Sequence, residues 1–195
     1  FSPVLLFTLS LLPVVAIPIS STFYAFSSDV SVLVVLALTT LTPIFVLLLG
    51  WSSDNKFSFI GSLREGYIMM AYEIPMFVSV LAMAVLYGSL NLIDIVNTQA
   101  NGLWGFILNP FATIAFFGAI LMTTARFPFD ITEAESEIVI GPYTEYSGIY
   151  FVLCMGTSYI KLYIMSLFFA EVFLGGWNPL IWPLTVSPIL SGIVV

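Results

Sequence analysis

Long apolar stretches separated by short polar connections run through most of this chain. Five of them approach the roughly 20 residues that a helix needs to cross the hydrocarbon core of a bilayer. They are residues 4–20, 30–50, 68–88, 103–125 and 148–173. A sixth begins near Pro179 and continues to Val195. Since the alternating strands of a membrane barrel are absent from the sequence, the pattern predicts one all-α, polytopic transmembrane domain over residues 1–195, with five full transmembrane helices and a truncated sixth.

Proline residues interrupt several of these stretches. Pro13, Pro43, Pro75 and Pro110 all lie within predicted spans. Proline removes a backbone donor and clashes with the preceding turn, so it bends a helix that contains it. We therefore expect kinked rather than straight transmembrane helices.

Composition narrows the class of protein further. Of the 195 residues, 60% are hydrophobic and 8% are charged, whereas soluble domains have about 45–50% apolar and about 25% charged residues. The chain has one cysteine, no histidine and a net charge of −7. These counts exclude a soluble fold, a zinc site and nucleic acid as a partner.

The few basic residues predict an orientation in the membrane. Lys56 and Arg64 lie in the predicted connection 51–67, and Arg126 begins the connection 126–147, whereas the other two connections have no Lys or Arg. The positive-inside rule places the two basic connections on the cytoplasmic or matrix side. The sequence thus predicts a multi-pass protein of a prokaryotic plasma membrane or a mitochondrial inner membrane.

Residues 126–147 combine acidic and apolar side chains in a short cytoplasmic helix or loop. Asp130 can cap a helix, Glu133 follows three residues later as in a capping box, and a Gly-Pro pair would end that helix. At 100° per residue, Asp130, Glu133 and Glu137 share one face, where neighbouring carboxylates can hold and pass protons. The alternative is a solvated acidic face, which has little use for the apolar side chains among the acids: Phe127, Phe129, Ile131, Ile138, Val139 and Ile140.

Two ionisable side chains lie well inside predicted spans. Glu73 is about five residues into the span 68–88, and Lys161 is about thirteen residues from either end of the span 148–173. Burying an unpaired charge there costs about 3 kcal/mol or more. This favours a proton-carrying carboxylate at Glu73 and, at Lys161, a proton-relay lysine with a carboxylate partner or a neutral amine. An interfacial glutamate and a structural ion pair are the alternatives. Glu171, near the outer end of its span, is expected to be interfacial.

Two blocks of the sequence resemble a known family. The first comprises Arg126, Pro128-Phe129-Asp130, Glu133, Glu135, Glu137, Gly141 and Glu145-Tyr146-Ser147. The second comprises Gly50-Trp51-Ser52-Ser53, Lys56-Phe57-Ser58, Gly61-Ser62-Leu63-Arg64 and Tyr72-Glu73-Ile74-Pro75. Both are similar to the membrane subunit of respiratory complex I that is called subunit 1 in mitochondria and the H subunit in bacteria, and to its relative in energy-converting hydrogenases. The resemblance covers nearly the whole chain and implies that further helices of the family precede Phe1 and follow Pro179.

The resemblance implies a role in a redox-driven ion pump. The subunit would anchor the peripheral electron-transfer arm and help form a quinone-binding cavity and an acidic proton path beside that arm. Quinone would be the substrate of the complex, and the iron–sulfur clusters would belong to partner subunits, with no cofactor bound by this chain alone. The partners would be the peripheral-arm subunits, neighbouring membrane subunits and the lipid bilayer.

The residues and the resemblance together give candidate sites. The proton path would include Glu73, Asp130, Glu133, Glu135, Glu137, Glu145 and Lys161. The quinone cavity and the junction with the peripheral arm would include Arg64, Arg126, Phe129 and Tyr146. We expect no metal site and no complete catalytic site in this chain.

The chain also departs from the respiratory pattern of that family. Ala134 separates two glutamates, Pro142 follows the loop glycine, and Ser158-Tyr159 stands where respiratory members tend to carry Glu-Tyr. These forms are closer to those of the membrane hydrogenases. The equivalent subunit of an energy-converting nickel–iron hydrogenase therefore stays open as the alternative. A stand-alone secondary transporter is less favoured, because no inverted repeat is visible.

Overall fold

The computed structural model describes residues 1–20, 22–25, 27–126, 129 and 141–178. Within these residues the chain forms helices and connections and no strand, which confirms the all-α prediction. The described helices are α1 (Ser2–Ala16), α2 (Ser31–Thr39), α3 (Thr42–Ser52), α4 (Lys56–Tyr87), α5 (Leu92–Asn101), α6 (Gly105–Leu108), α7 (Pro110–Thr123), the 3₁₀ turn η1 (Gly141–Tyr143) and α9 (Ile149–Phe173).

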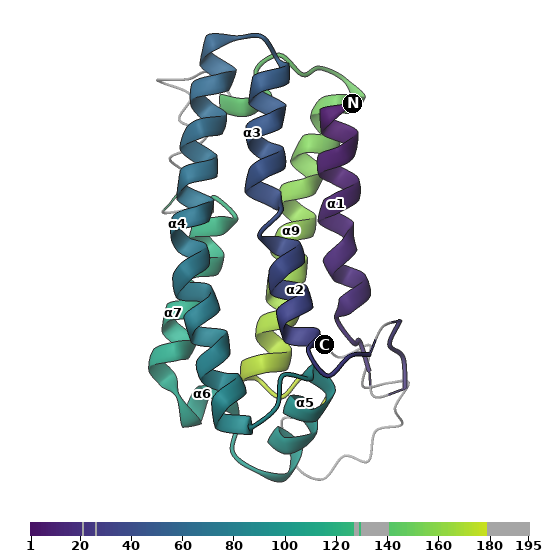
Figure 1. The fold of residues 1–195 in the computed structure, drawn as a ribbon, viewed down its shortest axis with the longest axis vertical. Helices are drawn as coiled ribbons and strands as arrows, with labels where there is room; N and C mark the ends of the chain where they lie inside the picture. Colours follow the sequence, from purple (N-terminus) through teal and green to yellow (C-terminus); the bar gives the residue numbers. More distant parts are fainter. Residues whose placement is uncertain (21, 26, 127–128, 130–140, 179–195) are drawn as a thin grey trace.

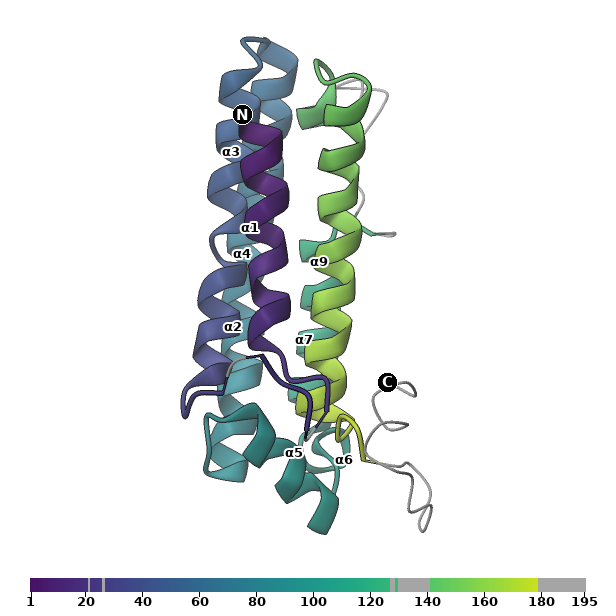
Figure 2. The same cartoon turned by 90° about the vertical axis from the view of Figure 1, so that its right-hand side faces the viewer.

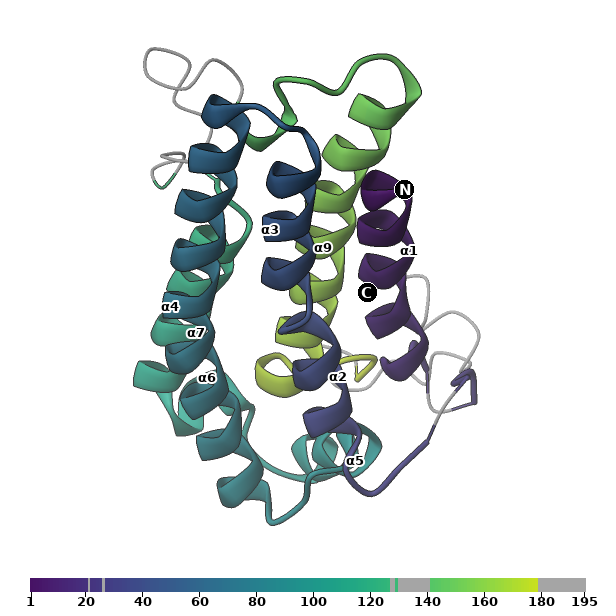
Figure 3. The same cartoon turned by 45° about the horizontal axis from the view of Figure 1, so that its top comes forward.

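The long helices run roughly parallel to the longest axis of the molecule (Figure 1). Helix α3 lies between α4 and α1 (Figure 3) and packs against both. Helix α9 runs beside α1 (Figure 2), whereas α7 packs mostly on α4. Helices α5 and α6 lie at one end of the bundle, and η1 lies at the other end, where the chain begins (Figure 1). The two ends of the bundle are therefore structurally different.

Three helical segments are long and apolar enough to cross a membrane. They are Ser31–Ser52, which combines α2 and α3, Lys56–Tyr87 and Ile149–Phe173. Each overlaps a predicted span, 30–50, 68–88 or 148–173, so a helix long and apolar enough to cross a membrane is confirmed at each of the three places. Helix α4, with 32 residues, would extend about 48 Å at 1.5 Å per residue, which exceeds the roughly 30 Å hydrocarbon core.

The other predicted spans appear as shorter apolar helices. Span 4–20 overlaps Ser2–Ala16, and span 103–125 contains Pro110–Thr123. Helices of 15 and 14 residues reach about 22 Å, less than the thickness of the hydrocarbon core. Five crossings therefore stay a prediction, and the sixth span falls on residues 179–195, outside the described part of the chain.

The prolines occupy two kinds of position. Pro13 and Pro75 lie inside α1 and α4. Pro43 and Pro110 stand instead in the first turn of α3 and α7, where the missing N–H group would have no intrahelical partner anyway. A new helix thus begins at or just before each of these two prolines. Kinks at Pro13 and Pro75 stay a prediction.

The predicted connection 51–67 is the clearest error of the sequence reading. Helix α4 begins at Lys56 and therefore contains Arg64. The side chain of Asn55 caps it by accepting from the N–H of Phe57 at 2.9 Å. The buried positions of its first turns carry small or polar side chains at helical spacing, namely Ser58, Gly61, Ser62 and Glu65. A search for apolar periodicity does not detect such a stripe.

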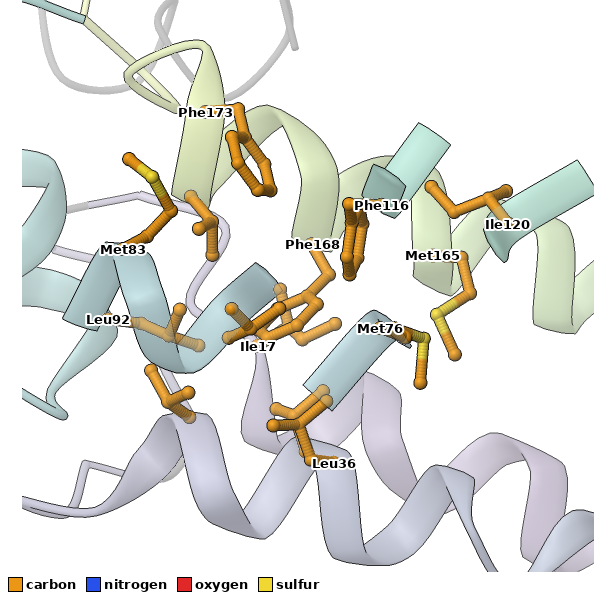
Figure 4. Packing of buried hydrophobic residues seen from close by; sticks show 14 of the residues in the cluster. Ile17, Leu36, Met76, Met83, Leu92, Phe116, Ile120, Met165, Phe168 and Phe173 are labelled. Atoms are coloured by element: carbon orange, nitrogen blue, oxygen red, sulfur yellow. The ribbon is translucent and has the colours of Figure 1, made fainter. Parts of the chain in front are cut away.

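A large aromatic and aliphatic cluster holds α9 to α7, α4 and α2. The ring of Phe116 on α7 lies 5.9 Å from that of Phe168 and 5.3 Å from that of Phe173, both on α9. Met76 and Leu36 are fully buried beside these rings (Figure 4). This dry cluster fixes the register of α9 and so determines where its polar side chains lie.

The other end of α4 makes a close backbone contact with η1. The hydroxyl of Ser58 donates to the carbonyl of Pro142 at 2.7 Å. At Gly61, an added Cβ would lie 2.8 Å from backbone atoms of Gly141 and 2.9 Å from the nitrogen of Pro142. Only glycine at position 61 allows this approach, which places Tyr143 against α4.

Replacing Gly61 with alanine should therefore destabilise the protein. The new methyl group would force η1 away from α4 at an expected cost of about 1–3 kcal/mol. The matched control is Gly118→Ala on α7, where a Cβ meets nothing within 4 Å. Thermal unfolding of the two detergent-solubilised variants compares them directly. Equal melting temperatures would show that η1 is not packed on α4 as described.

Candidate functional site

A buried carboxylate and a buried amine lie together between α4 and α9. Glu65 is 4% exposed and Lys161 is 5% exposed. Both line one internal cavity. A charged group in a membrane-spanning bundle is costly unless it is paired or hydrated. The buried Glu65 and Lys161 are therefore the strongest candidates for a functional site.

Specific contacts fix the two side chains. The hydroxyl of Tyr143 donates to Oε1 of Glu65 at 3.4 Å. Nζ of Lys161 donates to the sulfur of Met69 at 3.5 Å, and a thioether is a weak acceptor. The charge of Lys161 also interacts with the charges of Glu73 and Glu65. We call Glu65, Glu73 and Lys161 the buried charge cluster.

Helical spacing explains why these groups meet. Glu65, Met69 and Glu73 are four residues apart on α4 and so lie within about 80° of one another around the helix axis. On α9, Lys161 belongs to the buried stripe that also contains Cys154 and Thr157. The apolar residues around this region form a second, smaller core cluster: Leu6, Val46, Leu49, Met69, Tyr143 and Cys154.

The cavity has room for about one water molecule. Its volume is about 20 Å³, and a buried water needs at least roughly 10–15 Å³. Hydroxyl groups line part of it, and those of Thr123, Thr124 and Thr157 donate to carbonyls of their own helices. Their oxygen lone pairs therefore stay available as acceptors for water. The arrangement can bind a water between a carboxylate and an amine.

Arg126 does not line the cavity and contacts α9 at an exposed residue. Its guanidinium is 4.6 Å from the centroid of the Tyr159 ring on α9, a cation–π contact. Its Nε has no hydrogen-bond partner among the described residues. The backbone N–H of Phe129 donates to the carbonyl of Arg126 at 2.7 Å. The structure thus anchors the start of the acidic loop on α9.

Glu145 and Tyr146 lie away from the buried charge cluster, at the end of the bundle. The exposed carboxylate of Glu145 accepts from the side-chain amide of Asn55, the residue that caps α4. The hydroxyl of Tyr146 donates to the carbonyl of Leu49 at 3.0 Å and lies 2.9 Å from the hydroxyl of Ser52. Both residues tie the segment before α9 to the ends of α3 and α4.

The remaining candidates divide into two groups. Arg64 is half-buried on α4, one residue before Glu65. Asp130, Glu133, Glu135 and Glu137 lie outside the described residues, as do the interleaved apolar positions from Ile131 to Ile140. The helix predicted for that segment is therefore neither confirmed nor contradicted.

Glu65 is the site residue that sequence reasoning missed. It stands in a stretch that the apolar pattern assigns to a connection, so the pattern gives it no role. Its spacing of eight residues from Glu73 was a usable signal, because two acids that far apart on one helix share a face. Glu171 also differs from expectation, since the bundle buries it to 3% exposure rather than leaving it interfacial.

Metal ligation finds no support in the described part of the chain. There, no group of three or more Cys, Asp or Glu side chains is placed to hold a metal ion. The single cysteine, Cys154, is a buried free thiol. The groups that the cavity does offer are carboxyl, amine and hydroxyl groups.

The comparisons with known proteins all point to one protein family. A protein-family model described as NADH dehydrogenase matches residues 1–195. The H subunit of the NADH-quinone oxidoreductase of Geobacillus thermodenitrificans is 39% identical over 178 residues, which is 91% of this chain and 53% of that protein. The H subunit of the Carboxydothermus hydrogenoformans enzyme is 37% identical over 177 residues, 91% of this chain and 50% of that protein. The chain spans about half the length of the curated relatives that it matches.

Proposed function

The chain belongs to the NADH dehydrogenase family, and from that premise we propose that it forms part of the membrane subunit that couples redox chemistry to proton translocation in a complex I-like pump. Its relatives, which are named as the H subunit of NADH-quinone oxidoreductase, support this choice. The complex would be an oxidoreductase that reduces quinone. This chain would contribute to the membrane anchor and the proton path, while the iron–sulfur clusters would lie in partner subunits.

The buried charge cluster is the observation that carries the proposal. A passive membrane anchor has no need for a carboxylate and an amine that are both almost fully buried. Intramembrane ionisable groups are costly and commonly mark ion or proton pathways. The cluster joins the long helix α4 to α9, so any change in its charge acts on both.

Within the cluster, a change in the charge of one group would change the proton affinity of the others. A proton that arrives on Glu65 cancels the attraction between this carboxylate and Lys161. The charge of Lys161 then interacts mainly with Glu73, and release of the first proton reverses the change. A water in the cavity would bridge Glu65 and Lys161, which both line it. Movement of one proton would thereby alter the affinity of the next site for a proton.

The other candidate residues would surround this path. Arg64, Arg126, Phe129 and Tyr146 would form the junction with the peripheral arm and part of the quinone cavity. Asp130, Glu133, Glu135, Glu137 and Glu145 would continue the acidic path. The basic residues of that end would face the cytoplasm or matrix, and the five predicted spans, two bent at Pro13 and Pro75, would cross an energy-transducing membrane.

Purification of the complex from its native membrane tests the proposal. Quinone reduction by the intact complex, with no stoichiometric nickel, is the expected result. Stoichiometric nickel together with hydrogen evolution would contradict it and assign the chain to a membrane hydrogenase, which the forms at Ala134 and Ser158 favour. A subunit that is stable alone and transports a solute would exclude both.

A further inference from the structure

We propose that Glu171 is a second proton-binding site, at the end of the bundle opposite η1 and separate from the buried charge cluster. Its carboxyl group would hold an exchangeable proton and share it with water in an adjoining cavity. The inference concerns proton occupancy at one residue and does not depend on the proposed redox function.

The first support is the burial of this carboxyl group. Glu171 lies in the last turn of α9 and is 3% exposed. Its Oε2 is buried and has no hydrogen-bond partner among the described residues. A buried polar atom without a partner costs about 1–3 kcal/mol, so a group held this way needs water or another ligand.

The second support is a cavity directly beside this group. The cavity has a volume of about 40 Å³ and is lined by Glu171 together with Ile17, Pro18, Leu167 and Trp177. Because one buried water needs at least roughly 10–15 Å³, two or three would fit. Tyr163, whose side chain is exposed in this chain, is also among the residues that line it.

The described residues that line the cavity beside Glu171 include no cation that would stabilise an ionised carboxylate. The cavity walls contain no Lys or Arg, and Tyr163 is the other titratable side chain among them. The residues of α1 are uncharged, and α5 contacts the backbone of this turn through the amide of Gln99. Nε2 of Gln99 donates to the carbonyls of Glu171 and Val172, each at 3.0 Å, and so uses both of its hydrogens.

The helix itself also acts against a negative charge. The C-terminal end of a helix carries about half an elementary negative charge, and the effect is strongest in the last turn. A carboxylate there is disfavoured both by its burial without a cation and by the negative end of the helix. The neutral acid avoids both costs, because its O–H can donate to a water molecule in the cavity.

A proton fits this site better than a metal cation. Calcium and magnesium take about six or more oxygen ligands, and hard cations in general need several. Beside Glu171, most of the cavity wall is apolar, from Ile17, Pro18 and Leu167. One carboxylate with a few waters cannot supply such a ligand set, whereas a proton needs a single acceptor and one hydrogen-bond partner.

The site is separated from the buried charge cluster. Glu171 follows Lys161 by ten positions, which corresponds to about 15 Å along α9. Over that distance the buried positions of α9 are apolar, as Ile164, Met165 and Phe168 are. Figure 4 shows Phe168 beside Ile17 in this dry region. A proton on Glu171 therefore exchanges with the nearer end of the bundle rather than through the cluster.

Labelling with a hydrophobic carbodiimide in native membranes tests the inference, because this reagent modifies protonated carboxyl groups in apolar surroundings. Mass spectrometry should find the adduct on Glu171 and not on the exposed Glu145. Infrared spectra should show a protonated carboxyl C=O band that disappears in Glu171→Gln. Since Gln resembles the neutral acid, this variant should assemble at the wild-type level. An unmodified Glu171, or a carboxyl band that persists in the Gln variant, would overturn the proposal. If Glu171→Gln failed to assemble, Glu171→Asp should keep the band at a shifted frequency, and its absence there would overturn it as well.

Discussion

Lys161→Met should sharply reduce the amount of assembled protein in the membrane. Lys161 is buried between α4 and α9, and its charge interacts with those of Glu65 and Glu73. Methionine fills a similar volume but deprives both carboxyl groups of that charge. Removing one partner from a buried set of charges costs about 3–5 kcal/mol, a large fraction of the stability of a typical protein. Native gel electrophoresis of membrane extracts, with thermal unfolding of what remains, measures the loss.

A compensating change separates this explanation from simple misfolding. Adding Glu65→Gln to Lys161→Met removes a carboxylate together with the cation, so the double variant should recover much of the lost assembly. Lys56→Met is the matched control, because Lys56 is exposed at the start of α4, and it should assemble normally. If the losses of assembled protein caused by Lys161→Met and by Glu65→Gln simply added up in the double variant, the two side chains would not be coupled.

Glu65→Gln alone should assemble but slow redox turnover by roughly tenfold or more, a modest effect for the loss of a proton-transfer group. The amide keeps the size of the side chain and can still accept from Tyr143, but it cannot carry a proton. In a tightly coupled pump, blocked proton movement holds back electron transfer. The measurement is the quinone reduction rate of variant membranes, corrected for the amount of assembled subunit.

Two comparisons sharpen this experiment. Glu65→Asp keeps a carboxyl group on a shorter stem and should retain part of the rate. Asp94→Asn removes an exposed carboxylate on α5 and should leave the rate unchanged. A wild-type rate in Glu65→Gln would exclude Glu65 from proton transfer, even if the side chain still supports the fold.

The sequence predicted the long apolar helices well because their signal is simple. A run of about 20 apolar residues is sufficient evidence for a membrane-length helix, as in α4 and α9. It failed at residues 56–67, since the buried face there is built from small and polar side chains such as Ser58 and Gly61. The same failure concealed Glu65. Helical spacing alone would have shown that Glu65 and Glu73 share a face.

The contacts and burial of several candidate side chains could not be predicted from their spacing along the sequence. Lys161 was expected to have a carboxylate partner or a neutral amine. In the structure its Nζ donates to the sulfur of Met69, and Glu73 and Glu65 are the carboxylates whose charges act on it. Glu145 and Tyr146, which were grouped with the proton path and the quinone cavity, contact the cap of α4 and the end of α3, and those roles stay predictions. Glu171 was expected at an interface and is buried instead. Each outcome depends on contacts between residues more than 70 positions apart, which no local pattern encodes.

The most direct test of the account is the number of protons translocated per electron pair in membrane vesicles that contain Glu73→Gln. Glu73 is the half-buried carboxylate of the cluster whose charge interacts with Lys161. We predict normal assembly and a clearly lower proton-to-electron ratio than in wild-type vesicles and in the Asp94→Asn control. A wild-type ratio in Glu73→Gln would contradict the claim that the buried charge cluster carries protons.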